Sequence, residues 1–400
     1  MGSTRGASPP HPVDVDLARG PPGPGPSGRR YPRVLGRRPG RAPGRTVVIS
    51  GGIHGNEPAG VEAALRVLAQ LPDVLPRGEV VAVAGNLKAL AADRRFVGRD
   101  LNRGWTPDLP ERLRAASRLD PEEEEQRGLL AVIEPLCEAA SEPVVFIDLH
   151  TTSGPGAPFA CMADVLRNRP FAFCLGLPVV LGLEEVIEGS MLGYLCDLGH
   201  VGVAVEGGQH EDPASVERLE VALWRVLVEA QVIDPADVPA DRGGADRDPT
   251  LPEVIEIRYR HVCRDGDGFE MAPGLSSFQP IRKGQTIAHD ARGPIRATQG
   301  GLLLLPRYQG AGEDGFFVSR PVKRRWLHLS ARLRRSGAER LLEGLPGIRP
   351  DPARPGTYLV DPRWAARPVI DLFHLFGFRR IRPEGPSLAF SRRRPDTPDD

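Results

Sequence analysis

The sequence predicts an α/β protein in which a sheet is flanked by helices and followed by a second, small all-β domain. Short apolar runs alternate with amphipathic stretches between residues 46 and 230, as expected of strands buried between layers of helices. A polar stretch rich in Pro, Gly and Asp ends this pattern at 234–250, and strand-like alternation begins at residue 253. The 400 residues are enough for two buried cores.

The elements of the first part follow from continuous apolar runs and helical periodicity. Four short, β-branched runs predict buried strands: Val47–Ser50, Val80–Ala84, Val144–Asp148 and Val201–Val205. Three stretches between or after them predict helices: Pro58–Gln70, Pro121–Ala140 and Pro213–Ala230. The last two begin with proline directly after Asp120 and Asp212, which suit the N-cap position.

Composition divides the chain into five predicted segments. Residues 1–44 are rich in Pro, Gly and Arg, and we expect them to be disordered. Residues 45–233 form the predicted α/β domain, 234–250 a linker and 251–321 the small β domain. The remaining residues, 322–400, are basic and mixed in pattern, and the sequence assigns them no fold.

The overall composition is that of a soluble globular protein. Hydrophobic residues make up 40% of the chain and charged residues 26%. No apolar run approaches the roughly 18–20 residues of a membrane span, and Gly and Pro interrupt the N-terminus too often for a secretory signal. The five cysteines are an odd number without a C-x-x-C pair, which is typical of reduced thiols in a cytoplasmic protein.

The net charge of zero hides an uneven distribution. Residues 1–45 have a balance of +7 and residues 320–400 of +9, so the middle of the chain is acidic. Basic ends can indicate nucleic-acid binding. The C-terminal arginines, however, alternate with Pro, Gly and Leu without interleaved aromatic residues. We therefore expect a solvated surface, with nucleic-acid binding as the alternative.

The segment Gly51–Glu57 is the most informative part of the chain. It follows a predicted strand and places His54 and Glu57 three residues apart, at the sheet edge where open α/β sheets bind ligands. Such a pair is common by chance. A third candidate, His150, follows the predicted strand Val144–Asp148. Two histidines and a glutamate form a typical ligand set of catalytic zinc, Zn²⁺, which keeps its fourth position open.

Two carboxylates could support such a site. Asp148 lies two residues before His150 and therefore points to the same face of the strand. It can orient the imidazole as carboxylates behind zinc ligands do, although a histidine bonded at a strand end is the simpler alternative. Glu206 follows the strand Val201–Val205 and suits a general base, or else is a solvated turn residue.

The segment Arg94–Arg103 contains four arginines and Asn102. Arginine binds carboxylates bidentately and keeps its charge. The cluster therefore predicts a pocket for a substrate carboxylate and a donor for an oxyanion. Single arginines of the cluster could instead pair with Asp93 or Asp100.

Four motifs in order, G-G-x-H-G-N-E, R-x(4)-D-L-N-R, D-L-H-T-T-S and V-E-G-G-Q, resemble the succinylglutamate desuccinylase/aspartoacylase family. The similarity covers roughly residues 45–320. It implies the zinc carboxypeptidase fold, with a mixed sheet flanked by helices. The N-terminal 44 and last 80 residues have no counterpart that we can place in the family.

The resemblance implies a role for each matching residue. His54, Glu57 and His150 correspond to the zinc ligands and Glu206 to the catalytic base. The resemblance further implies that Asn102 and Arg103 grip the substrate α-carboxylate and that Arg95 polarises the scissile carbonyl. Because the family uses its β domain to narrow the entrance, Tyr308 is a candidate for substrate binding, with a packed core tyrosine as the alternative.

The implied reaction is zinc-dependent hydrolysis of the amide bond of a small-molecule N-acyl amino acid. Neither a succinyl nor an aspartyl preference carries over, because the residues that select the acyl group lie outside the shared motifs. The alternative enzyme is a zinc carboxypeptidase or peptide amidase acting on a peptide end. An alternative from another class is a non-catalytic binding protein that kept this fold. Loss of any of the four central residues would have indicated it, and all four are present: His54, Glu57, His150 and Glu206.

Overall fold

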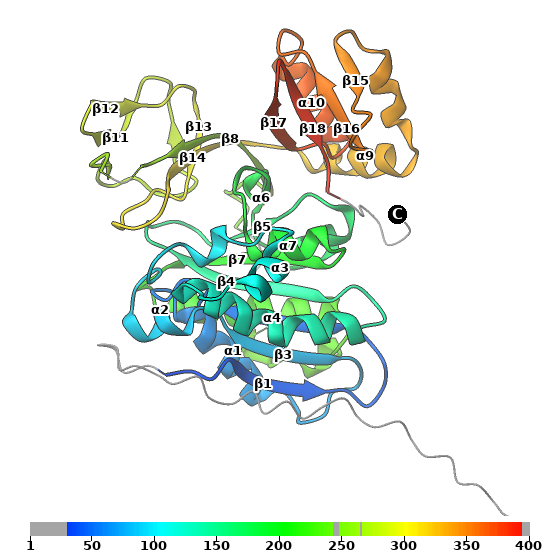
Figure 1. Ribbon diagram of the computed structural model, residues 1–400. Coiled ribbons are helices and arrows are strands. Elements are labelled where there is room, and N and C mark those ends of the chain that lie inside the picture. Colours follow the sequence, from blue (N-terminus) through cyan, green and yellow to red (C-terminus); the bar gives the residue numbers. More distant parts are fainter. Residues whose placement is uncertain (1–29, 243–247, 265, 394–400) are drawn as a thin grey trace, which may run out of the picture.

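The computed structural model describes residues 30–242, 248–264 and 266–393. These residues form a large mixed sheet with helices on both faces, a small three-stranded sheet and a four-stranded C-terminal sheet (Figure 1). The predicted α/β fold with additional all-β structure is confirmed. None of the described helices combines the length and apolar character needed to cross a membrane. The disorder predicted for residues 1–29 lies outside the described residues.

The large sheet has eleven strands and both parallel and antiparallel neighbours. In spatial order these are β1 (Val34–Pro39), β3 (Glu79–Ala84), β2 (Thr46–Gly51), β4 (Val145–Thr152), β7 (Val201–Gln209), β5 (Phe159–Met162), β6 (Val179–Leu181), β8 (Val254–Val262), β14 (Asp314–Pro321), β13 (Gly301–Leu304) and β10 (Pro280–Ile281). The central strands β3, β2, β4 and β7 are parallel to one another. All four predicted buried strands are therefore present, side by side.

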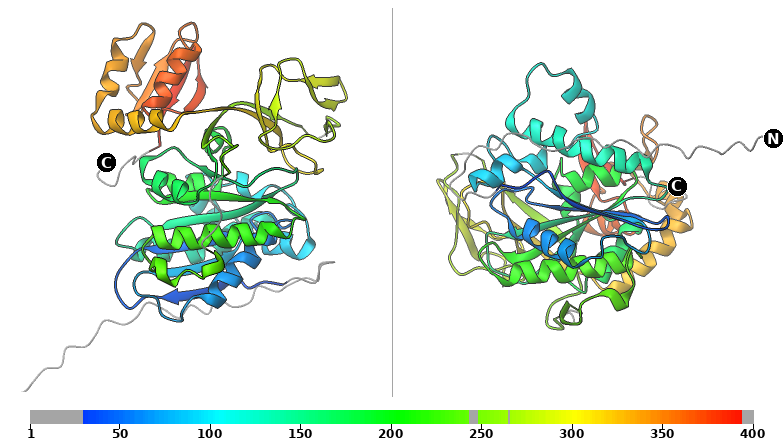
Figure 2. Two further views of the ribbon diagram at one scale, coloured as in Figure 1. Left: turned by 180° about the vertical axis from the view of Figure 1, so that it is seen from behind. Right: turned by 90° about the horizontal axis from the view of Figure 1, so that it is seen from below.

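Helices cover both faces of this parallel section (Figure 2). Val47 and Ile49 of β2 pack in the same core as α1 (Ala59–Gln70), α5 (Arg169–Cys174) and α8 (Ala214–Glu229). Val48, which points to the other face, packs with α3 (Leu109–Ala115), α4 (Pro121–Ala139) and α7 (Met191–Asp197). Because both faces are buried, the strands need continuous apolar runs instead of alternating ones.

The helix boundaries follow their capping residues. The side chain of Asp120 accepts a hydrogen bond from the Glu123 amide at 2.8 Å, and the Glu123 side chain accepts one from the Asp120 amide at 3.0 Å. This capping box begins α4 as predicted. For α8 the N-cap is Pro213, and Asp212 lies one residue earlier. Asp212 still accepts a hydrogen bond from the Ala214 amide at 3.0 Å.

Residues 34–39 correct the expectation that the first 44 residues are disordered. They form β1, which pairs antiparallel with β3 at the edge of the sheet. Two contacts with the rest of the protein, which amino-acid composition does not reveal, explain why this strand forms. Leu35 packs against the core, and the Arg37 Nε lies 2.8 Å from a carboxylate oxygen of Glu79 on β3.

The segment after residue 250 continues the large sheet. β8 pairs with β6 in parallel, and β14, β13 and β10 follow it outward. Beside them, β9 (Glu270–Met271), β11 (Thr286–Asp290) and β12 (Gly293–Arg296) form the three-stranded sheet. The described residues between 254 and 321 therefore form strands and no helix, but their sheet is continuous with the first part of the chain. The division into domains at the predicted boundaries stays a prediction.

The basic C-terminal segment has a fold of its own (Figure 1, orange to red). It contains the helices α9 (Arg324–Arg335) and α10 (Arg367–Leu375) and the strands β15 (Ile348–Pro350), β16 (Thr357–Val360), β17 (Arg380–Glu384) and β18 (Ser387–Ser391). Aromatic side chains dominate its core, including Tyr358, Phe373 and Phe390. Several of its arginines form ion pairs with the large sheet and its flanking segments, as Arg379 does with Asp164.

Candidate active site

The loop after β2 holds the first two site residues. The chain leaves the sheet at Gly52, whose φ of 73° lies in the left-handed region that favours glycine. At Gly55 a Cβ atom would lie 2.0 Å from the backbone carbon of Ala89, so no other residue fits there. These constraints bring His54 and Glu57 into the interior, where their exposed fractions are 5% and 3%.

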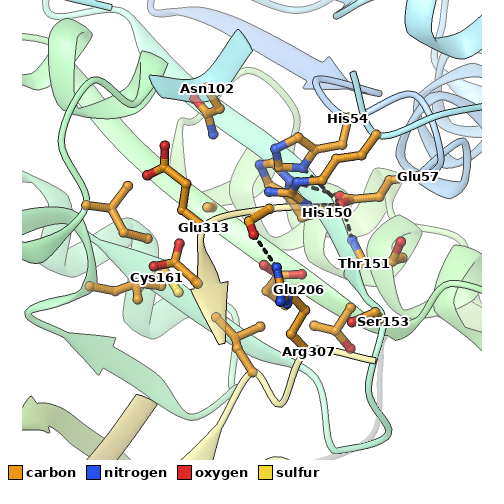
Figure 3. A pocket seen from close by; sticks show the side chains of 18 of the residues that line it. His54, Glu57, Asn102, His150, Thr151, Ser153, Cys161, Glu206, Arg307 and Glu313 are labelled. Atoms are coloured by element: carbon orange, nitrogen blue, oxygen red, sulfur yellow. Dashed lines mark hydrogen bonds and ion pairs between the residues drawn. The ribbon is translucent and has the colours of Figure 1, made fainter. Parts of the chain in front are cut away.

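The strands β4 and β7 supply the other central residues. They are parallel neighbours, and His150 lies beside Glu206 in their register. Side chains at paired positions point to the same face of a sheet. Glu206 is therefore part of a strand and not of a turn, and its carboxylate stands next to His150 over the same pocket (Figure 3).

Both histidines direct the same nitrogen at Glu57. The Nδ1 of His54 lies 2.9 Å from one carboxylate oxygen of Glu57, and the Nδ1 of His150 lies 3.0 Å from the other. One donor atom from each of the three residues lies within 4.8 Å of the other two. The structure thus brings together the three predicted zinc ligands, and their ligand atoms converge on one point (Figure 3).

The opposite nitrogen of each ring faces a second carboxylate. The Nε2 of His150 lies 2.8 Å from Asp148, which also accepts a hydrogen bond from Ser50 at 2.7 Å. The Nε2 of His54 lies 3.3 Å from Asp100. A carboxylate behind each ring fixes the orientation of that ring and leaves Nδ1 available as a ligand.

The charges of the cluster shift its acid–base equilibria. Burial raises the pKa of Glu206 to about 8, because desolvation disfavours the charged carboxylate. Burial also acts on Asp100, but the neighbouring His54 and Arg95 hold its pKa well below the usual range. Likewise, the two histidines hold the pKa of Glu57 well below its usual range despite burial. Among these three carboxyl groups, Glu206 is thus the one suited to carry a proton near neutral pH.

The arginine-rich segment lines one side of the pocket. The Arg95 guanidinium lies 3.0 Å from Asp100 and 3.4 Å from Glu57. Asn102 accepts a hydrogen bond from the Met191 amide at 2.8 Å. Arg103 also lines the pocket.

The guanidinium of Arg103 already forms hydrogen bonds within the protein. Its guanidinium donates to Asp314 on β14 at 2.8 Å and to the backbone oxygen of Asn102 at 2.9 Å. Any carboxylate that Arg103 binds would therefore share it with Asp314.

The cavity itself is small and partly covered. Its volume is about 120 Å³, and the segment 305–314 between β13 and β14 lines it together with the motif residues. Pro306, Arg307 and Gln309 contribute to this lining, but Tyr308 does not.

The predicted role of Tyr308 in substrate binding stays a prediction, and in this structure the side chain bonds to the β-rich segment after residue 250. Its hydroxyl donates to the backbone oxygen of Ala272 at 2.7 Å and accepts from the Leu275 amide at 3.0 Å. The Tyr308 side chain therefore points toward the segment that contains Ala272 and Leu275. Its neighbour Arg307 lines the cavity.

Sequence reasoning misses several residues of the site. Asp100 stands inside a recognised motif, but the sequence indicates it only as a partner for arginine. Glu184 and Asp314 have no motif and reach the pocket through tertiary contacts. The two consecutive glutamates 184 and 185, in an otherwise apolar stretch, are the one signal that the sequence offers.

Comparison with known proteins agrees with this geometry. Residues 43–218 match the family described as the succinylglutamate desuccinylase/aspartoacylase catalytic domain. A probable aspartoacylase of Prochlorococcus marinus is 30% identical over 265 residues, which cover 61% of this chain and 80% of that protein. The rat N-acyl-aromatic-L-amino acid amidohydrolase (carboxylate-forming) is 35% identical over 215 residues, which cover 48% of this chain and 62% of that protein.

Solved structures give the same picture of the fold. The crystal structure of a succinylglutamate desuccinylase/aspartoacylase from Rhodobacter sphaeroides superposes with a TM-score of 0.54 at 22% identity, covering 72% of this chain and 88% of that one. The structure of a succinylglutamate desuccinylase from Vibrio cholerae superposes with a TM-score of 0.54 at 16% identity. The match covers 70% of this chain and 82% of that one. The chain belongs to the succinylglutamate desuccinylase/aspartoacylase family.

Proposed function

We propose that this protein is a zinc-dependent amidohydrolase that cleaves an N-acyl amino acid into a carboxylic acid and a free amino acid. The observation that carries this proposal is the convergence of both Nδ1 atoms on Glu57, with Glu206 in the same pocket. The names of the relatives support the reaction class, since they include aspartoacylases and an N-acyl amino acid amidohydrolase.

The residues present fit zinc. Two imidazole nitrogens and one carboxylate are a common protein ligand set of catalytic zinc, and a carboxylate orients each ring from behind. His54, Glu57 and His150 would hold the ion. When bound, zinc supplies Lewis-acid chemistry and makes water a better nucleophile at neutral pH.

Glu206 is proposed as the group that moves the proton. One of its carboxylate oxygens is buried and has no hydrogen-bond partner among the described residues, so it is available to an incoming molecule. A nearby cation favours the charged form of a carboxylate, which would bring the pKa of Glu206 below the value of about 8 set by burial. Glu206 would then accept a proton from the attacking water and donate it to the departing nitrogen.

Three residues are proposed to position the substrate. The guanidinium of Arg95 stands beside the ligand cluster, where it can stabilise negative charge that develops on the scissile carbonyl oxygen. Asn102 and Arg103 line the same cavity and are proposed to bind the substrate α-carboxylate.

A small substrate is favoured over the end of a peptide. The cavity volume is about 120 Å³, and residues 305–314 lie against it. A peptidase would need an open cleft for the rest of its chain. The peptide-end alternative therefore has no support from the shape of the pocket.

A cytoplasmic location stays a prediction from the cysteine pattern.

The test is amine release from a panel of N-acyl amino acids that varies both the acyl group and the amino acid. We expect hydrolysis of at least one member, loss of that activity with a chelator, and recovery on adding Zn²⁺. Hydrolysis that survives complete removal of metal would contradict the zinc-dependent reaction. Absence of activity toward the whole panel, together with cleavage of peptides, would favour the peptide-end alternative.

A further inference from the structure

Glu184 is a buried carboxylate that faces the active-site cavity. It lies in the short helix α6 (Leu183–Val186) and is 8% exposed. One of its oxygens accepts a hydrogen bond from the Ser190 hydroxyl at 2.6 Å. That bond fixes the side chain, and the residue contributes to the cavity lining.

No Lys, Arg or His among the described residues forms an ion pair with this side chain. The nearby Arg393 donates instead to the backbone oxygen of Glu184 at 2.9 Å, and its guanidinium pairs with Asp197. By contrast, Glu57, Asp100 and Asp148 each contact an imidazole or a guanidinium. The charge of Arg393 still acts on Glu184, but without direct contact between the charged groups. A buried carboxylate without such a contact is unfavourable, and an ammonium group of a ligand would supply it.

The cavity that Glu184 faces also has apolar lining residues. These are Leu183, Ala204 and Phe317, together with Cys161. Burial, followed by the charges of Glu206 and Glu184, raises the pKa of the Cys161 thiol, so Cys161 is a neutral wall residue. Methylene groups would pack well against these side chains.

Glu184 lies on the side of the cavity where the amino-acid half of the substrate is expected. Ser190, which holds Glu184, is followed by Met191, whose amide donates to Asn102 at 2.8 Å. Asn102 is a proposed ligand of the substrate α-carboxylate. A group that reaches Glu184 would therefore belong to the amino-acid side chain and not to the acyl group.

We propose that Glu184 selects amino acids with an aliphatic side chain that ends in an amino group. The methylenes would contact the apolar wall, and the terminal ammonium would pair with the free oxygen of Glu184. Anionic side chains would be repelled by the same carboxylate. This inference rests on the proposed function, because it identifies the substrate class of that site.

The test compares Nα-acetyl-L-ornithine with Nα-acetyl-L-norleucine, whose side chain has the same shape without the charge, and with Nα-acetyl-L-glutamate. We expect the wild type to prefer the ornithine substrate on the order of 100-fold in kcat/KM, because an analogue that lacks the charged group leaves Glu184 unpaired. Glu184→Gln should reduce this preference to less than about tenfold, mainly through KM, because Gln keeps the contact with Ser190 but not the charge.

Glu185→Gln is the matched control. Glu185 is the next residue and is also buried, but its carboxylate accepts from the Asp164 amide at 2.9 Å and does not line the cavity. This variant should keep the preference of the wild type. Equal preference for ornithine and norleucine in the wild type, or an unchanged preference in Glu184→Gln, would overturn the proposal.

Calorimetric binding of free L-ornithine and free L-norleucine separates this proposal from the proposed function. Selective binding of ornithine that Glu184→Gln abolishes would support the side-chain site even if no acetylated substrate were hydrolysed. Hydrolysis without any selectivity for ornithine in either experiment would refute the role of Glu184 and leave the amidohydrolase function intact.

Discussion

The His54–Glu57–His150 cluster and the Glu256–Asp371–His374 cluster contain the same kinds of side chain but have different neighbours. In each cluster one possible ligand atom per residue lies within 4.8 Å of the others. In the first, two imidazoles direct Nδ1 at a shared carboxylate. In the second, a single imidazole lies 2.7 Å from Glu256.

Arginines occupy the carboxylates of the second cluster. Glu256 pairs with Arg258 at 2.6 Å and with Arg320 at 3.2 Å, and it also accepts a hydrogen bond from Arg379. Although burial opposes it, the charges of Arg379 and His374 lower the pKa of Glu256 to about 2. The Glu256 carboxylate is therefore charged, but the surrounding arginines already balance its charge and occupy its oxygens, so it is a poor ligand for a metal ion.

The comparison teaches that ligand types and short distances do not suffice to identify a metal site. In the first cluster one arginine contact reaches Glu57, at 3.4 Å, and the cluster opens onto a cavity that holds a further carboxylate, Glu206. The second cluster belongs to the contact between β8 and α10, where ion pairs join the C-terminal segment to the sheet. We infer a catalytic role for the first and a structural role for the second.

The largest effect on activity is expected from Glu206→Gln. Removing a general base costs about 10²–10⁴-fold in kcat, whereas the ligand set is untouched, so the metal content should stay that of the wild type. Steady-state kinetics on a substrate from the panel, together with metal analysis, would check both. A rate within a few-fold of the wild type would refute the general-base role.

Asp164→Asn tests the structural role of the ion pairs. Asp164 pairs with Arg169 at 2.9 Å, Arg334 at 2.8 Å and Arg379 at 2.5 Å. Removing one partner of a buried ion pair lowers stability by about 3–5 kcal/mol, since the other charges stay buried. Denaturant unfolding should show a loss of this size, with metal content per folded chain unchanged. Unaltered stability would show that this network does not hold the C-terminal segment in place.

A smaller effect is expected from Asp148→Asn. Loss of the carboxylate behind a metal-binding histidine reduces metal affinity or activity by about 10–100-fold. The counterpart in the second cluster, Asp371→Asn, should leave metal affinity at the wild-type value. Competition with a chromophoric chelator measures both. Equal metal affinities in Asp148→Asn and Asp371→Asn would contradict the conclusion that only the first cluster binds the metal.

The sequence predicts those parts of the molecule in which neighbouring residues determine the structure. The buried strands of the parallel section are continuous apolar runs, and His54 and Glu57 lie in one short loop. His150 and Glu206 can be identified because each follows such a run. The fold of this section, and the positions of these four residues at the ends of apolar runs, therefore follow from the amino-acid sequence alone.

The remaining features depend on contacts between distant segments. β1 is ordered by pairing with β3, although its composition resembles a disordered chain. Arginines of the basic C-terminal segment pair with acidic residues of the α/β part, as Arg379 does with Asp164. Glu184 reaches the cavity without belonging to a motif. Charge counts along the sequence cannot show which of these charges meet.

The most direct test of the contrast between the two clusters is the metal content of purified protein. We expect about one zinc per chain in the wild type and in His374→Ala, and almost none in the His54→Ala/His150→Ala double variant. Circular dichroism would confirm that all three proteins are folded. Absence of zinc from the wild type, full zinc in the double variant, or loss of zinc in His374→Ala would contradict the assignment of the metal site to His54, Glu57 and His150.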